Sequence, residues 1–271
     1  MKKLLYLLPL ALLLAGCGGE PEDVPTEPTE PETKTVYVHS AITRTQSGVT
    51  SRTEYIYNEE DLLTDVIVSD AEGQELQRYL VSCDEHGNPV RWDSVVAGVE
   101  SSLLYTYDDK GHTLGTYAYT GDTLMTSTEY TWSGDLRVSS TVKVAAQNLE
   151  QRNEYAYNDK GVLERQDLYI GGVLSGYSLY TADAQGRPLS GENFDPEGNP
   201  TGTFTYAYDG ISEKRITTSD GVVVQTQELT YDFHGNLLSS HIYDGTGTLI
   251  SAEVHSWKAL EVPYHVPRAG V

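Results

Sequence analysis

A repeat of about 25 residues runs through most of this 271-residue chain and constrains its fold more than any other feature. Residues 155–163 read YAYNDKGVL, and the stretch that starts at Tyr105 reads YTYDDKGHTL. The second position of this Y-x-Y pair recurs every 23 to 26 residues, with a cysteine and an alanine in two places. The positions are Tyr57, Cys83, Tyr107, Trp132, Tyr157, Ala182, Tyr208, Tyr231 and Trp257. Such a period indicates that one supersecondary unit is repeated along the chain.

A turn sequence follows most of these positions: Asp or Asn, two variable residues and Gly. Examples are DEHG at Asp84, NDKG at Asn158 and DFHG at Asp232. This pattern predicts a type I turn in which the first side chain accepts backbone hydrogen bonds and the glycine adopts a positive φ. A second set of glycine turns lies midway between the first, as in DAEG at 70–73. Together the two sets predict a turn about every 12 residues, separated by runs of strand length.

The runs between turns alternate in polarity. In TSTEYTW, Thr128, Tyr130 and Trp132 share one side, whereas the residues between them share the other. A period of two with many Tyr and Thr residues predicts β-strands. We therefore expect an all-β antiparallel meander of about 18 strands. Because open twisted sheets rarely exceed about ten strands, we expect this sheet to roll or spiral on itself. A small β-propeller of four-stranded blades is the alternative, and an 18-stranded outer-membrane barrel fits the short, polar runs less well.

The pattern Y-x-Y-D-x-x-G-x-L resembles the YD repeat of the RHS family over residues 55 to 257. The stretch DAQGRPL, from Asp183 to Leu189, also carries the Gly-Arg pair of that family, whereas the other units depart from it. The resemblance implies a long sheet coiled into a hollow shell. In the RHS family the shell encloses a C-terminal toxin, but the sequence after Trp257 is only a short tail. An accessory role in a toxin and immunity system rests on this resemblance alone.

The N-terminus predicts a secreted, lipid-anchored protein. Residues 1–16 combine two lysines with an apolar run that is too short to span a bilayer, which is typical of a signal peptide. Leu14, Ala15, Gly16 and Cys17 resemble the lipobox of bacterial lipoproteins, which implies cleavage before Cys17 and its acylation, palmitate being one candidate chain. An ordinary signal peptide is the alternative. Two or more acyl chains give stable attachment to a membrane.

The mature chain divides into three parts on composition. Residues 17–35 are rich in Pro, Glu and Thr and predict a tether, residues 36–257 form the β-repeat domain, and residues 258–271 form a tail. We expect the folded part to stand outside the cytoplasm, held at the surface of a bacterial membrane. Cys83 is the only other cysteine, so a lipidated Cys17 would leave no intramolecular disulfide.

The charge of the chain argues against nucleic acid as a partner. There are 40 Asp and Glu residues against 18 Lys and Arg residues, a formal net charge of -22. Such a surface repels phosphate backbones and anionic lipids.

No catalytic or cofactor motif is present in the sequence. The histidines are scattered over different repeats without a metal-ligand spacing, and there is no phosphate-binding loop or nucleophile elbow. Most carboxylates lie in turns or on the polar side of strands, where solubility accounts for them. We therefore expect no metal, no cofactor and no enzymatic activity. A glycan-active enzyme is the alternative, and it would need two acids facing one another across a cleft.

The 20 tyrosines are the feature of the sequence that says most about a possible binding function. They can fill the interior of a rolled sheet, because the chain holds only three Phe and three Trp residues. Exposed, they could stack on sugar rings, as in the Tyr- and Trp-rich cell-wall-binding repeats that these units resemble. The candidate ligand-facing aromatics are Tyr105, Tyr107, Tyr130, Trp132, Tyr155, Tyr157, Tyr206 and Tyr208. We therefore expect a non-catalytic binding or scaffold surface for a surface glycan or a protein.

Overall fold

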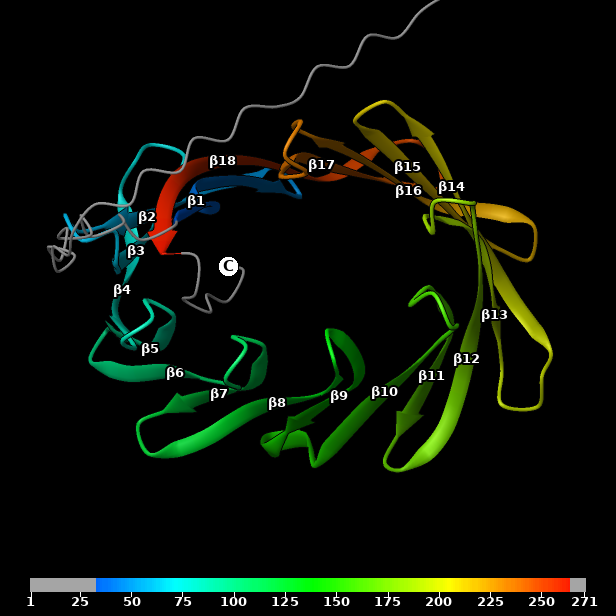
Figure 1. The fold of residues 1–271 in the computed structure, drawn as a ribbon, viewed down its shortest axis with the longest axis horizontal. Coiled ribbons are helices and arrows are strands. Elements are labelled where there is room, and N and C mark those ends of the chain that lie inside the picture. Colours follow the sequence, from blue (N-terminus) through cyan, green and yellow to red (C-terminus); the bar gives the residue numbers. More distant parts are fainter. Residues whose placement is uncertain (1–32, 264–271) are drawn as a thin grey trace, which may run out of the picture. The chain divides into compact units, whose positions relative to one another are not determined.

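A computed structural model describes residues 33–263, which form 18 strands and one short 3₁₀ turn at Ala145–Gln147 (Figure 1). The strands are β1 (Thr33–Gln46), β2 (Val49–Tyr57), β3 (Leu63–Asp70), β4 (Glu75–Cys83), β5 (Pro89–Val96), β6 (Val99–Tyr107), β7 (Thr113–Thr120), β8 (Thr123–Ser133), β9 (Leu136–Val144), β10 (Leu149–Tyr157), β11 (Leu163–Ile170), β12 (Val173–Ala182), β13 (Pro188–Phe194), β14 (Pro200–Asp209), β15 (Ser212–Ser219), β16 (Val222–Tyr231), β17 (Leu237–Asp244) and β18 (Leu249–Pro263). The expected all-β fold is confirmed.

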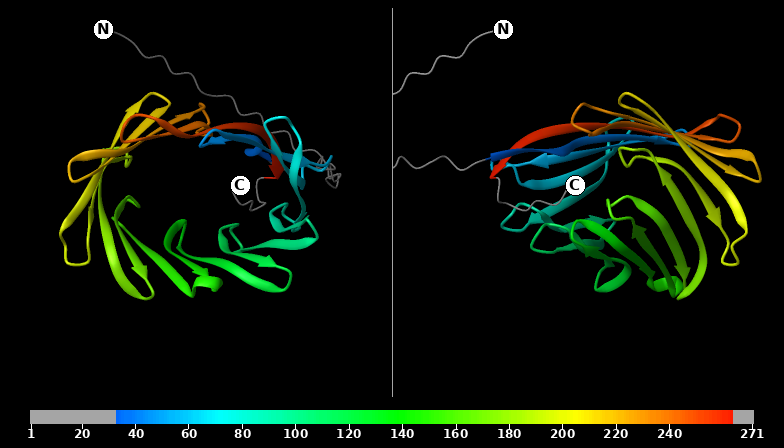
Figure 2. Two further views of the ribbon diagram at one scale, coloured as in Figure 1. Left: turned by 180° about the vertical axis from the view of Figure 1, so that it is seen from behind. Right: turned by 45° about the vertical axis from the view of Figure 1, so that its right-hand side comes forward.

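The sheet closes into a barrel. Each strand pairs antiparallel with the next, and β18 returns to pair with β1 from Thr33↔Pro263 to Gln46↔Ser251. In both views of Figure 2 the first strand, in blue, lies beside the last, in red. The expected rolled or spiral sheet and the alternative propeller are therefore wrong. Closure pairs the backbone N–H and C=O groups of the first and last strands, which would be unpaired edge strands in an open sheet.

The strands at the closure extend beyond the boundaries expected from composition. β1 begins at Thr33, within the stretch assigned to the tether, and β18 continues through Lys258 to Pro263, within the stretch assigned to the tail. The signal peptide, Cys17 and its lipobox lie outside the described residues.

The register determines the width of the barrel. If the paired residues are followed from strand to strand once around the barrel, the path returns to β1 about 18 residues away from its starting point. This displacement is the shear of the barrel, and it amounts to about one residue for each strand. A stagger of this size tilts the strands by about 35–40° and gives a backbone diameter of about 30 Å. Barrels of 16 to 18 strands are wide enough that side chains do not fill them. We call the interior the lumen.

The turns form as the sequence predicts. In the turn after β4, the carboxylate of Asp84 accepts hydrogen bonds from the backbone N–H groups of His86 (2.9 Å) and Asn88 (2.8 Å), and Gly87 has a φ of 80°. The turn after β16 repeats this arrangement at Asp232. Glycine adopts such a φ without strain, which explains why it occupies this place in most repeats, although Asp61 takes it in the turn after β2 with a φ of 59°.

Fully buried apolar residues are few in the described chain. They are Val38, Ala41, Leu63, Val66, Phe204, Leu260 and Val262, and none is a tyrosine. Val38, Leu260 and Val262 cluster where β1 meets β18, with Val36 and Tyr57 against them. The tyrosines therefore line a wall and do not form a fully buried core. No helix within residues 33–263 is both long and apolar enough to cross a membrane.

Candidate functional site

Two pockets identify the face of the sheet that lines the lumen. One pocket of about 480 Å³ is lined by residues from seven consecutive strands, β2 to β8, including Tyr55, Tyr79 and Trp92. The other, of about 640 Å³, is lined by residues from β9 to β14, including Tyr155 and Tyr206. Residues on so many successive strands can surround one space only on the concave side. We call these the β2–β8 pocket and the β9–β14 pocket.

The first tyrosine of each Y-x-Y pair faces the lumen. These residues stand on alternate strands and comprise Tyr55, Tyr105, Tyr130, Tyr155, Tyr180 and Tyr206; Tyr79 on β4 shares this face. Burial, together with the neighbouring hydroxyls of Tyr55, Tyr130 and Tyr79, raises the pKa of Tyr105 to about 12. Side chains on β2 and β6 are close enough to interact because the wall curves inward between them.

The second aromatic of each pair has a structural role, which we call the latch. Its hydroxyl or indole N–H donates to a backbone carbonyl 18 to 20 residues earlier on the preceding strand, at the start of that strand in every case except His39, which lies in the middle of β1. The donors and acceptors are Tyr57 and His39, Tyr107 and Pro89, Trp132 and Thr113, Tyr157 and Arg137, Tyr208 and Pro188, and Trp257 and Leu237, all at 2.7–2.9 Å. Cys83 makes the same contact, from its thiol to the Leu63 carbonyl at 3.5 Å.

A β-bulge accompanies the latch. In five of the even-numbered strands the register shifts immediately before the latch residue, as between Thr106 and Tyr107. The same shift occurs before Ala182 and Tyr231, which occupy the repeat position without the latch hydrogen bond, whereas Tyr208 is a latch on a strand without the shift. Bulges are frequent at the rims of barrels, where they redirect a side chain. Of the eight candidate aromatics, Tyr105, Tyr130, Tyr155 and Tyr206 therefore face the lumen, whereas Tyr107, Trp132, Tyr157 and Tyr208 are latches. Tyr157 also reaches the lining of the β9–β14 pocket.

The β9–β14 pocket rests on a small aromatic cluster. Phe204 is 2% exposed, and its ring centroid lies 5.3 Å from that of Tyr180 and 5.9 Å from that of Tyr206. It covers Gly191 on the neighbouring strand, where any Cβ would overlap the ring. The Tyr180 hydroxyl donates to the Gln166 side-chain carbonyl at 3.0 Å, which fixes its direction. The floor of the pocket is therefore rigidly held.

The β2–β8 pocket is more apolar. The Trp92 ring lies 5.8 Å from Tyr79 and 5.9 Å from Tyr105, with Val66 and Leu103 beside them. Sequence reasoning omitted Tyr55, Tyr79, Tyr180 and Trp92 from the candidates. Tyr55 and Tyr180 occupy the first position of the same repeat and could have been found, whereas Trp92 lies on an intervening strand without a repeat signal.

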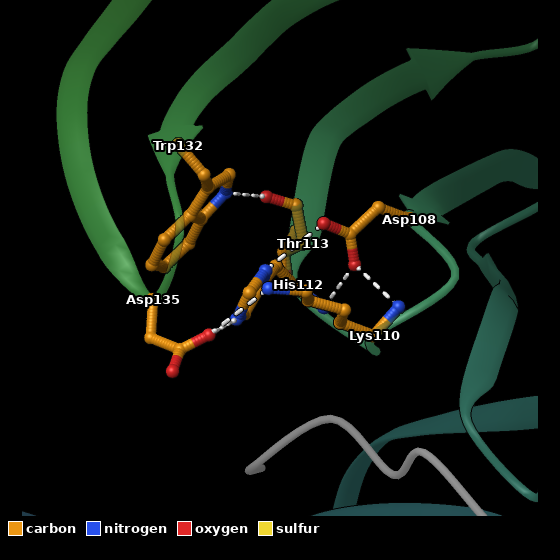
Figure 3. A network of polar contacts seen from close by, with 6 residues as sticks. All are labelled: Asp108, Lys110, His112, Thr113, Trp132 and Asp135. Carbon is orange, nitrogen blue, oxygen red and sulfur yellow. Dashed lines mark hydrogen bonds and ion pairs between the residues drawn. The ribbon is translucent and has the colours of Figure 1, made fainter.

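His112 connects two neighbouring turns at one end of the barrel (Figure 3). Its ring stacks on Trp132 at 4.6 Å, and its nitrogens lie 2.9 Å from Asp108 and 3.5 Å from Asp135. Burial opposes the charge of Asp108, but hydrogen bonds from His112 and the Lys110 N–H keep the pKa of this carboxyl below its usual value. The contacts of His112 with Asp108 and Asp135 join the turn after β6 to the turn after β8. Trp132, on which the His112 ring stacks, is itself a latch.

Within residues 33–263, no three His, Cys, Asp or Glu side chains are arranged to hold a metal ion.

Comparisons with known proteins give structural similarity without sequence relatives. No family model matches the sequence, and no curated protein matches it. Its fold is similar to a porin-like protein from Bacteroides uniformis, at 14% identity over 81% of this chain and 98% of that one, with a TM-score of 0.44. A porin-like protein from Bacteroides vulgatus gives 9% identity, 82% and 99% coverage, and a TM-score of 0.36. A chain of the TcdB2-TccC3-Cdc42 structure gives 15% identity over 77% of this chain but 15% of its own length, with a TM-score of 0.35.

No function is transferred from these structures, because the identities and TM-scores are low. The sequence comparisons support neither RHS nor lipoprotein family membership.

Proposed function

We propose that this protein is a lipid-anchored, extracytoplasmic barrel that binds glycan chains along its lumenal wall and performs no catalysis. One observation carries the proposal: the lumen-facing tyrosines stand on alternate strands above two pockets. Alternate strands are about 10 Å apart, so the rings form a series of platforms. Aromatic faces that alternate with hydroxyl and amide groups suit sugar rings, which have both apolar faces and polar edges.

The outer face of the barrel carries charged side chains, which favour contact with water over contact with lipid. Seven ion pairs lie on it, among them Arg52–Glu54, Arg91–Asp93 and Lys214–Glu228. Charged side chains on a lipid-facing wall are destabilising, so we assign membrane contact to acylated Cys17 and not to the strands. The acidic composition of residues 17–35 supports an extended tether between the anchor and the barrel.

The pocket linings favour binding over catalysis. Neither the β2–β8 pocket nor the β9–β14 pocket has a carboxylate among its lining residues, whereas glycoside hydrolysis requires two. A third pocket of about 330 Å³ contains three carboxylates, Asp209, Glu213 and Glu228. Glu213 lies on the lumenal face beside Tyr208, whereas Asp209 and Glu228 lie on the outer face, where Glu228 is paired with Lys214, so this pocket is not part of the lumenal wall to which we assign glycan binding.

A glycan array tests the proposal. Residues 18–271, which retain the tether and the barrel, are screened, and each hit is titrated against the variants Tyr155→Leu and Tyr180→Leu. Loss of at least about fivefold in affinity is expected, because each ring contributes roughly 1 kcal/mol or more of contact. Tyr243→Leu, on the outer face of β17, is the matched control and should leave affinity unchanged. Equal effects from inner and outer variants would refute lumenal binding.

The anchor is tested separately. A Cys17→Ser variant is expected to leave the membrane fraction, because it removes the acylated residue. An unchanged membrane fraction would contradict anchoring through Cys17.

A further inference from the structure

Most basic side chains of the described chain have an acidic partner. Of the 15 Lys and Arg residues between 33 and 263, 11 lie within 4.0 Å of a carboxylate. The four without such a partner among these residues are Lys34, Arg137, Lys160 and Arg215. In a chain with more than twice as many acids as bases, an unpaired cation is unexpected and calls for a local explanation.

Three of the four gather at the β9–β14 pocket. Arg137 and Lys160 line it, and Arg215 pairs in register with Tyr206, another lining residue. They come from β9, from the turn after β10 and from β15, so only the fold brings them together. The lining contains no Asp or Glu.

The arginines are held against aromatic rings and not against acids. The Arg137 guanidinium lies 4.9 Å from the Tyr155 ring centroid, and Nη2 is 3.4 Å from the Tyr155 hydroxyl. The Arg215 guanidinium lies 4.7 Å from the Phe204 centroid, and its buried Nε has no hydrogen-bond partner. Glu213, two residues away on the same face, makes no ion pair with it, although the charge of Arg215 partly offsets the burial that raises the pKa of the Glu213 carboxyl.

This arrangement leaves donors directed at the pocket. Stacking on an aromatic face orients a guanidinium but occupies none of its five N–H donors, which match a carboxylate or phosphate in a two-point contact. At about 640 Å³, the pocket is in the size range of small-ligand sites, and Gln185 supplies an amide for hydroxyl groups.

We propose that the β9–β14 pocket selects an acidic oligosaccharide. Arg137 and Lys160 bind its carboxylate or phosphate groups, and Tyr155, Tyr180 and Tyr206 contact its rings. Arg215, beside Tyr206 on the same face, adds positive charge. The proposal rests on the glycan-binding function above and names the class of glycan. It also gives the strongly acidic barrel a way to admit an anion: the outer bases are neutralised in pairs, whereas Arg137 and Lys160 are left for the ligand.

Calorimetric titration of residues 18–271 tests the selectivity. The carboxylate probe is an oligogalacturonate and the phosphate probe is a phosphorylated mannose oligosaccharide, each compared with its neutral counterpart of equal length. An acidic probe is expected to bind at least about tenfold more tightly than its counterpart, and the difference should shrink as salt is added. The probe with the larger difference identifies which anion the pocket takes.

Matched variants locate the site. Arg137→Gln and Lys160→Gln should each weaken the acidic probe by about tenfold while leaving the neutral sugar unchanged. Arg152→Gln is the control, because Arg152 also stacks on a tyrosine, Tyr169 at 4.6 Å, but lies on the outer face paired with Glu154. Thermal unfolding checks that each variant is folded, and Lys160, which lies in a turn, can be changed with little risk to the fold.

The outcomes separate this inference from the broader function. Equal binding of acidic and neutral sugars, lost in Tyr155→Leu, would overturn the anionic selectivity and keep the glycan function. Binding of a polyglutamate peptide or of inorganic phosphate as tightly as the acidic sugar would overturn the sugar assignment. No binding of any sugar by a folded sample would overturn both.

Discussion

Removal of one latch hydroxyl tests how the barrel holds its strand ends together. In the Tyr107→Phe variant the ring stays, but the 2.7 Å hydrogen bond to the Pro89 carbonyl is lost. Pro89 is buried, so water does not readily replace the missing donor. The change therefore isolates a single hydrogen bond at the end of β6 without creating a cavity.

The expected cost follows from the burial of the acceptor. A typical hydrogen bond contributes about 0.5–1.5 kcal/mol net, and an unsatisfied buried acceptor costs about 1–3 kcal/mol. We expect a loss of about 1–2 kcal/mol in the free energy of unfolding. For a domain of this size each kcal/mol corresponds to about 2–4 °C, so Tm should fall by about 2–8 °C.

Differential scanning calorimetry on residues 18–271 measures this change. Tyr117→Phe is the control, because the Tyr117 hydroxyl lies on the outer face and makes no hydrogen bond within residues 33–263. Cys83→Ala removes the naturally weak thiol latch and should cost less than Tyr107→Phe. If Tyr107→Phe and Tyr117→Phe shift Tm equally, the latch contributes nothing and the reasoning is wrong.

Three further results are expected from the same structure. Burial raises the pKa of Tyr105 and Tyr208 to about 12, whereas unfolded tyrosine ionises near 10, so their stabilisation is complete below about pH 10 and lost between about pH 10 and 12. A Tm from circular dichroism that stays constant across this range would contradict it. Asp232→Ala removes two backbone hydrogen bonds of its turn and should cost about 1 kcal/mol in urea unfolding, whereas Asp232→Asn, which restores the acceptor found in two sister repeats, should cost less. Gly191→Ala should destabilise the barrel by about 1–3 kcal/mol through overlap with Phe204, and Phe204→Leu in the same chain should relieve part of that cost; additive losses would argue against the overlap.

The turns and strand faces were predictable because their signals are local. An aspartate that accepts two backbone N–H groups and a glycine with positive φ mark each turn within five residues, as at Asp84 and Asp232. Alternation then gives the two faces of every strand. The number and direction of the strands follow from these local rules.

Closure and the division of roles between aromatics depend on distant parts of the chain. The pairing of Thr33 with Pro263 has no local signal, and the stretches that carry them resemble a tether and a tail in composition. Tyr105 and Tyr107 are two residues apart, so strand alternation alone would place both on the same face. Only the bulge between Thr106 and Tyr107 distinguishes the lumenal ring from the latch. Arg137, Lys160 and Arg215 share no repeat position, and only the curvature of the wall gathers them.

The pairing of the last strand with the first has a consequence for the order of synthesis. Thr33 hydrogen bonds to Glu261, 228 residues later, so β1 is synthesised long before β18 exists. A solenoid gains stability with each repeat that emerges, whereas this ring must wait for its final 15 residues before either end strand is satisfied. Until then the nascent chain has two open edges, which are templates for pairing with other chains. A ribosome that stops one hairpin early would therefore release an aggregation-prone sheet, and not a slightly smaller barrel.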